Sequence, residues 1–132
     1  MQKEWGQVLQ SLIKEKAGIS EVMHIIGDVE NKTCVLLDDI ADSASTLCNA
    51  AKALKDHGAS EIYSYIAHGV LSGNALEKIE QSDIKELVLT DSIFASADIK
   101  NTKNIRHISI APLMGEAIKR INSDSSVSAL FD

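Results

Sequence analysis

From Cys34 onward the chain alternates short apolar segments with longer segments of helical periodicity, and this alternation most restricts its fold. The apolar segments lack the regular polar alternation of strands that have one face in water, which is typical of strands buried on both faces. The pattern predicts a three-layer α/β fold, a mainly parallel sheet with helices on both faces. We expect strands over 34–37, 62–67, 86–90 and 105–110, and helices over 46–57, 74–80 and 112–121.

The N-terminal part adds two elements to this pattern. Apolar residues at helical spacing between Trp5 and Ile13 predict an amphipathic helix within residues 1–18, followed by the domain proper over 19–132. Two apolar stretches, Val22–Ile26 and Thr33–Leu37, flank a polar turn and predict a β-hairpin. The apolar face of the helix could cover the sheet of its own domain or dock on a partner.

Composition narrows the classes of function and of partner that the chain can have. A chain of 132 residues with 45% hydrophobic and 24% charged residues is typical of one globular domain. Its formal net charge of -6 argues against nucleic acid as a partner, because binding to phosphate backbones needs clustered Lys and Arg. No apolar run approaches the roughly 18 residues of a membrane-spanning helix. The two cysteines lack metal-ligand spacing and indicate reduced thiols, so we expect a cytoplasmic protein that binds no membrane.

The segment after the strand over 34–37 carries the candidate chemistry. Ligands of parallel sheets bind at the carboxyl ends of the strands. A turn that opens a helix presents backbone N–H groups and the positive end of the helix dipole, which favour a phosphate. Carboxylates at the strand end accept hydrogen bonds from sugar hydroxyls and can share a magnesium ion, and here Asp38 and Asp39 are the candidate ligands. The candidate ribose-phosphate site consists of Asp38, Asp39, Asp42, Ser43, Ala44, Ser45 and Thr46.

Two other interpretations compete with a phosphate site. Asp42 or a neighbouring serine could merely cap the helix, although capping does not explain two further aspartates where like charges repel. A receiver-like phosphoacceptor domain also places two acidic residues after its first strand, and Asp91 follows a later strand. That pattern lacks the lysine expected after the last strand, where Ile110-Ala111-Pro112 stands, and does not explain the hydroxyl-rich turn.

The segment from Val35 to Leu47 resembles the phosphoribosyl pyrophosphate signature of type I phosphoribosyltransferase folds. Further segments narrow the resemblance to the ribose-phosphate pyrophosphokinase family. They are Gly27–Val29, Ala67–Gly73, Ala111–Leu113, Glu116–Ile121 and Ser126–Phe131. The resemblance covers about Ile19 to Phe131 and implies a phosphoribosyltransferase-like fold.

This resemblance implies a reaction in which ATP donates pyrophosphate, with magnesium, to the anomeric hydroxyl of ribose 5-phosphate. Asp38 would bind the ribose hydroxyls, and residues 42–46 would form the 5-phosphate loop. Family members carry two similar domains and form symmetric oligomers, and this chain resembles the second domain only. We therefore expect a homo-oligomer that binds ribose 5-phosphate or phosphoribosyl pyrophosphate. We expect ATP binding only with a partner domain, and no catalysis by this chain alone.

Within the resemblance, Ala44 and Ser45 stand where the family commonly has glycine. We expect their β-carbons to crowd a bound phosphate or to force an unfavourable backbone. The alternative function within the same family is a regulatory or vestigial subunit that acts by association with other subunits.

Overall fold

The computed structural model of the chain describes residue 25 and residues 27–131. Strands and helices alternate along the chain, as the sequence predicts. The strands are β1 (Thr33–Ala41), β2 (Glu61–Gly69), β3 (Glu86–Thr90) and β4 (Ile105–Ile108). The helices are α1 (Ser45–Asp56), α2 (Ala75–Glu80), α3 (Ala97–Asn101) and α4 (Ala111–Asn122), followed by a short 3₁₀ helix, η1 (Ser128–Leu130).

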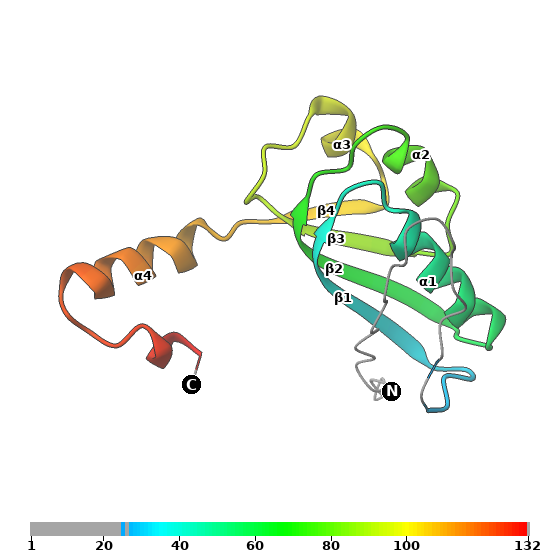
Figure 1. Cartoon of the computed structure of the whole chain (residues 1–132), viewed down its shortest axis with the longest axis horizontal. Helices are drawn as coiled ribbons and strands as arrows, with labels where there is room; N and C mark the ends of the chain where they lie inside the picture. Colours follow the sequence, from blue (N-terminus) through cyan, green and yellow to red (C-terminus); the bar gives the residue numbers. More distant parts are fainter. Residues whose placement is uncertain (1–24, 26, 132) are drawn as a thin grey trace.

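The strands form one sheet in the order β1-β2-β3-β4, and every neighbouring pair is parallel. Right-handed crossovers between successive neighbouring strands put their helices on the same face of the sheet. Accordingly, α1, α2 and α3 are grouped beside the sheet in Figure 1. The register aligns Leu36, Ser64, Leu87 and Ile105 in one row across the sheet. The α/β class and the parallel sheet flanked by helices are confirmed. The described helices α1, α2 and α3 share one face, whereas the sequence pattern predicted helices on both faces, and on the other face Leu37 and Tyr65 are 47% and 37% exposed.

The hydrophobic core joins the sheet to these helices. Leu36, Ile62 and Leu87 of the strands are all buried, with at most 5% of their surface exposed. Helix α1 buries residues 47, 50, 51 and 54, the spacing of a single helix face, and they join the same cluster. This packing holds the end of β1 and the start of α1 in place, and the candidate site lies between them.

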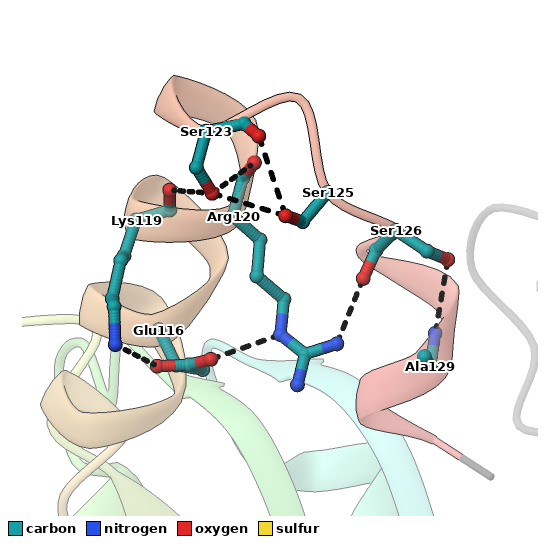
Figure 2. Close-up of polar contacts among 7 residues, drawn as sticks. All are labelled: Glu116, Lys119, Arg120, Ser123, Ser125, Ser126 and Ala129. Atoms are coloured by element: carbon teal, nitrogen blue, oxygen red, sulfur yellow. Dashed lines mark hydrogen bonds and ion pairs between the residues drawn. The ribbon is translucent and has the colours of Figure 1, made fainter.

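Helix α4 lies apart from this core. Figure 1 shows it leading away from the sheet beyond β4, and none of its residues is buried. The Arg120 guanidinium donates to the Glu116 carboxylate at 2.9 Å and to the Ser126 carbonyl at 2.9 Å, as Figure 2 shows. The Ser123 hydroxyl donates to the Lys119 carbonyl at 3.0 Å. These contacts fold the chain after α4 back along the helix.

The structure corrects several expected element bounds. Strand β1 continues past Leu37 to Ala41, β4 ends at Ile108, and α3 and η1 were not predicted. The helix expected within residues 1–18 and most of the hairpin strand at 22–26 lie outside the described residues. In the described part of the chain, no helix is both long enough and apolar enough to cross a lipid bilayer.

Candidate functional site

Both candidate carboxylates lie within β1, and not after its end as the sequence suggested. Asp38 pairs with Ile66 of β2, and the strand runs on to Ala41, which pairs with Gly69. Both aspartates are exposed, so the two carboxylates remain accessible to a ligand. One carboxylate oxygen of Asp38 accepts a hydrogen bond from the Asp39 amide at 2.9 Å.

The strand geometry separates these two carboxylates. Successive side chains of a β-strand point to opposite faces of the sheet, so Asp38 and Asp39 leave β1 in opposite directions. Two carboxylates that share one magnesium ion must converge on it. Among the described residues, no group of three or more His, Cys, Asp or Glu side chains is arranged to hold a metal ion. The arrangement favours at most one of the two carboxylates in any single ion site.

The turn between β1 and α1 forms the second part of the site. Ala44 occupies the N-cap position with a left-handed backbone, at a φ of 56° and a ψ of 5°. The first helical hydrogen bond is donated by the Cys48 amide to the Ala44 carbonyl at 3.0 Å. The amides that come before Cys48 in the first helical turn have no carbonyl partner within the helix, and they point out of its N-terminal end. The cap position therefore belongs to Ala44, whose methyl group cannot cap, and not to Asp42 or a serine.

The expected strain is present at Ala44 but not at Ser45. A positive φ is unfavourable for alanine, whereas Ser45 is not among the described residues that have a positive φ. The Ala44 side chain is buried, with 4% of its surface exposed, so its methyl group points into the protein. The burial of this methyl group therefore does not support the predicted crowding of a ligand by the Ala44 β-carbon.

The connection between β2 and α2 braces the turn from the other side. The amides of Val70 and Leu71 both donate to the Ala41 carbonyl, at 2.9 and 3.1 Å, and the Ser72 amide donates to the Asp42 carbonyl at 3.1 Å. Three consecutive amides thus hold the start of the turn between β1 and α1. The segment between β2 and α2 therefore contacts the turn through its backbone.

Lys78 of α2 is the functional candidate that sequence reasoning missed. Its ammonium group donates to the Ser45 hydroxyl at 2.8 Å and to the Ser43 carbonyl at 3.3 Å. It brings a positive charge to a turn that otherwise carries the negative charge of Asp42. The only sequence signal was the position of Lys78 in the helix after the second strand, and that position does not indicate which way its side chain points.

The end of β3 supports the same edge of the sheet. The Thr90 hydroxyl donates to the Ser92 hydroxyl at 2.9 Å, and His68 Nδ1 lies 2.8 Å from the same hydroxyl oxygen. Ser92 also donates to the Ala67 carbonyl at 2.8 Å. These contacts tie the ends of β2 and β3 together and give His68 a structural role.

Comparison with known proteins decides the family. A family model described as the phosphoribosyl synthetase-associated domain matches residues 4–132. The chain belongs to this family.

Relatives of this phosphoribosyl synthetase-associated domain include ribose-phosphate pyrophosphokinases from Hyphomonas neptunium and Caulobacter vibrioides, which are 56% and 59% identical to it. The matches cover 90% and 87% of this chain, but 38% and 37% of the two relatives. The chain therefore spans well under half of their length. The crystal structure of phosphoribosylpyrophosphate synthetase from Mycobacterium smegmatis has a TM-score of 0.73 and 30% identity, over 79% of this chain and 35% of that one.

Asp91, the residue behind the receiver-like alternative, is held by the segment between β4 and α4 in this phosphoribosyl synthetase-associated domain. Its carboxylate accepts hydrogen bonds from the Ser109 hydroxyl and from the Ile110 amide. These bonds, the Ser109 bond above all, lower the pKa of Asp91 below its ordinary value. Such bonds give Asp91 a structural role between β3 and α4, so the receiver-like alternative gains no support from it.

Proposed function

We propose that this domain binds ribose 5-phosphate or phosphoribosyl pyrophosphate at the carboxyl end of β1. The phosphate lies in the loop Asp42–Thr46, and the ribose hydroxyls lie on Asp38. One observation carries the proposal: the loop opens the 12-residue helix α1 through a left-handed Ala44. A helix start of this length offers aligned amides and a positive dipole end to an anion. The cation Lys78 lies against the same loop.

Asp38 has the capacity to bind the sugar. A carboxylate offers about four lone-pair sites, and the Asp39 amide uses one of them. The remaining sites suit the two vicinal hydroxyls of a ribose, which donate to a carboxylate in charge-assisted hydrogen bonds. A phosphate group at one end and a diol at the other define a ribose phosphate, whereas a phosphate site alone defines no sugar.

The family's reaction is a further part of the proposal. In a ribose-phosphate pyrophosphokinase, the anomeric oxygen of ribose 5-phosphate forms a bond to the β-phosphorus of ATP. The bond between this phosphorus and the oxygen bridging to the α-phosphorus breaks, and AMP leaves. In this reaction, the residues described above bind and orient the sugar phosphate. We propose that the ATP site and the cations that stabilise the transferred group belong to a partner domain.

Magnesium remains a prediction in a restricted form. We propose that either Asp38 or Asp39 supplies a single carboxylate ligand, because the strand directs the two side chains to opposite faces. Mg²⁺ in phosphate-transfer sites is commonly held by one or two carboxylates together with substrate phosphates and water. The ion would neutralise phosphate charge. The proposed binding of ribose 5-phosphate by the loop and Asp38 does not require the ion.

Calorimetric titration of the full chain tests the proposed function. Ribose 5-phosphate and phosphoribosyl pyrophosphate are titrated with and without magnesium, and ribose serves as the ligand without phosphate. We expect ribose 5-phosphate to bind and ribose to bind far more weakly. Asp38→Ala should weaken ribose 5-phosphate binding about tenfold or more, because hydrogen bonds to a charged group are lost. Asp56→Ala, an exposed change at the far end of α1, is the matched control.

Two results would contradict the proposal. Equal affinity for ribose and ribose 5-phosphate would show that the loop does not bind phosphate. An Asp38→Ala variant with wild-type affinity would show that the ribose hydroxyls do not bind this carboxylate.

A further inference from the structure

The contact of Lys78 with the phosphate loop joins two parts of the chain that are far apart in sequence. Lys78 lies 33 residues after Ser45 and 35 residues after Ser43, and its ammonium group bonds to both. Helix α2 holds the lysine in place, because Ala75 and Ile79 on either side of it are completely buried. The Lys78 side chain is half-buried itself, so its charge is less screened than that of an exposed lysine.

The bond to the Ser43 carbonyl determines the direction of the next amide. A trans peptide group is planar, and its C=O and N–H bonds point in opposite directions. Because the Ser43 carbonyl points toward Lys78, the Ala44 N–H points away from Lys78. Rotation of this peptide would break the bond to the lysine. Lys78 therefore favours one orientation of an amide in the loop proposed to bind phosphate.

The bond to Ser45 determines how its hydroxyl is used. A serine hydroxyl offers one donor hydrogen and two acceptor lone pairs. The Ser45 oxygen accepts from Lys78 at 2.8 Å and from the Ser43 hydroxyl at 3.4 Å. Its own hydrogen is then directed away from both donors and is left to donate. A hydroxyl that accepts from a cation is also a stronger donor, because neighbouring hydrogen bonds polarise one another.

From these contacts we infer that Lys78 is a positioning residue of the phosphate loop, which orients the Ser43–Ala44 peptide and makes Ser45 a donor to the 5-phosphate. The inference rests on the proposed function, because it assigns roles within the same site. It also explains how a serine serves at a position where glycine was expected. The Ser45 side chain supplies a phosphate donor, and its loss should weaken binding.

The test compares ribose 5-phosphate binding by calorimetry in the full chain, in four single variants and in the double variant Lys78→Met with Ser45→Ala. Lys78→Met removes the charge at similar length, Lys78→Arg retains it, and Ser45→Ala removes the hydroxyl. Lys52→Met removes an exposed charge of α1 that lies about 10 Å along the helix from Ser45, and it is the control. Melting temperatures are measured for each protein, and the ¹H–¹⁵N resonance of Ala44 reports on the orientation of its amide.

We expect Lys78→Met and Ser45→Ala each to weaken binding about tenfold, as the loss of one hydrogen bond to a charged group implies. Lys78→Arg should restore most of the affinity, and Lys52→Met should bind as the wild type does. In the double variant, the two losses should be less than additive, because the residues act as one unit. The Ala44 resonance should shift in Lys78→Met and not in Lys52→Met.

Different outcomes separate the two proposals. If the wild type binds ribose 5-phosphate and folded Lys78→Met binds equally well, the inference about Lys78 is wrong and the proposed function stands. Equal losses in Lys78→Met and Lys78→Arg, with full affinity in Ser45→Ala, would also overturn the inference. If the wild type binds no ribose 5-phosphate, both proposals fail.

Discussion

Asp91, at the end of β3, accepts a hydrogen bond from the hydroxyl of Ser109, which lies 18 residues further along the chain. The same carboxylate accepts from the Ile110 amide at 2.9 Å, and the Asp91 amide donates to the Ile108 carbonyl at 3.1 Å. These three bonds lie where β4 ends and α4 begins. One aspartate therefore joins the end of the sheet to the start of α4.

The first prediction concerns this aspartate and pH. Because hydrogen bonds from Ser109 and Ile110 lower the folded-state pKa of Asp91, its carboxylate stabilises the fold above its unfolded pKa of about 3.9. This contribution is lost as the pH falls through the lower, folded-state pKa. Asp91→Asn should therefore be less stable than the wild type near pH 7, and the difference should shrink below about pH 4. Urea unfolding at several pH values measures it, with the exposed Asp83→Asn as control. A stability difference between the wild type and Asp91→Asn that does not vary with pH would contradict this role of the Asp91 carboxylate.

The second prediction concerns Gly69 at the end of β2. A β-carbon built on Gly69 would lie 2.7 and 2.9 Å from the two methyl carbons of Leu89, which is buried. Gly69→Ala should lower the free energy of unfolding by about 1–3 kcal/mol, the usual cost of overpacking a core. Gly115→Ala is the control, because its β-carbon meets nothing within 4 Å in α4 and should stabilise the helix by about 0.5–1 kcal/mol. Thermal and urea unfolding measure the stability of both variants. A Gly69→Ala variant as stable as the wild type would show that Leu89 moves aside freely.

The third prediction separates strain from ligand affinity at Ala44. Ala44 has a left-handed backbone in the folded chain, and we expect its strain to be a cost of folding and not of binding. In Ala44→Gly, relief of about 1–2 kcal/mol of strain is offset by the loss of a buried methyl group, about 0.8 kcal/mol, and by the backbone entropy of glycine. Stability should change by less than about 1 kcal/mol, and affinity for ribose 5-phosphate by less than about threefold.

Ala50→Gly is the matched control for this change, because Ala50 is also buried but lies inside α1. It should lower the free energy of unfolding by about 1.5 kcal/mol, since no strain is relieved. If Ala44→Gly were as destabilising as Ala50→Gly, the left-handed conformation at Ala44 would not be strained. A large gain in affinity would show instead that the free loop adopts another conformation.

The fourth prediction is that a polypeptide of residues 1–132 forms no phosphoribosyl pyrophosphate from ATP and ribose 5-phosphate. Transfer of a pyrophosphoryl group needs several cations around the reacting phosphates. The sequence contains no arginine before Arg106, and its cations before the first described strand are Lys3, Lys14, Lys16 and Lys32. Chromatographic detection of AMP and phosphoribosyl pyrophosphate checks this expectation. Sustained turnover that depends on magnesium would contradict it.

The fifth prediction concerns α4 and self-association. Met114, Ile118 and Ile121 recur at helical spacing and are 51%, 63% and 65% exposed. Exposed apolar surface of this kind favours association, and we expect dimers or larger species by light scattering. Ile118→Glu should shift the mass toward the monomer. Lys103→Gln alters the net charge by the same amount at an exposed position outside α4 and should not shift it. A wild-type chain that stays monomeric at high concentration would contradict the prediction.

Local pattern was sufficient to predict most of the described sheet. The apolar run Leu87-Val88-Leu89 predicted β3 with the bounds that the structure shows, because a short buried strand needs little more than its own hydrophobicity. β1 was predicted too short, because Asp38 and Asp39 are polar. Their strand conformation comes from pairing with β2, which continues to Gly69. Helix α3 was missed because its five residues are too few to show helical periodicity.

The candidate site was predictable only in part, because some of its features also depend on tertiary contacts. The sequence indicates that the residues from Asp42 to Thr46 form a hydroxyl-rich turn before a helix. It does not show that Ala44 takes the cap position, since most residues avoid a left-handed backbone. Lys78 was unpredictable because its contact with Ser45 depends on how α2 packs beside α1. Tertiary contacts of this kind leave no periodic signal.

The sequential order β1-β2-β3-β4 also has a consequence during synthesis on the ribosome. Each new strand pairs with the strand made just before it, so the sheet can grow in the direction of translation and no late strand has to insert between earlier ones. The Lys78 contact to the phosphate loop can form once α2 has left the exit tunnel, before β3 and β4 are complete. The nascent chain can therefore assemble the turn between β1 and α1 before the last two strands join the sheet.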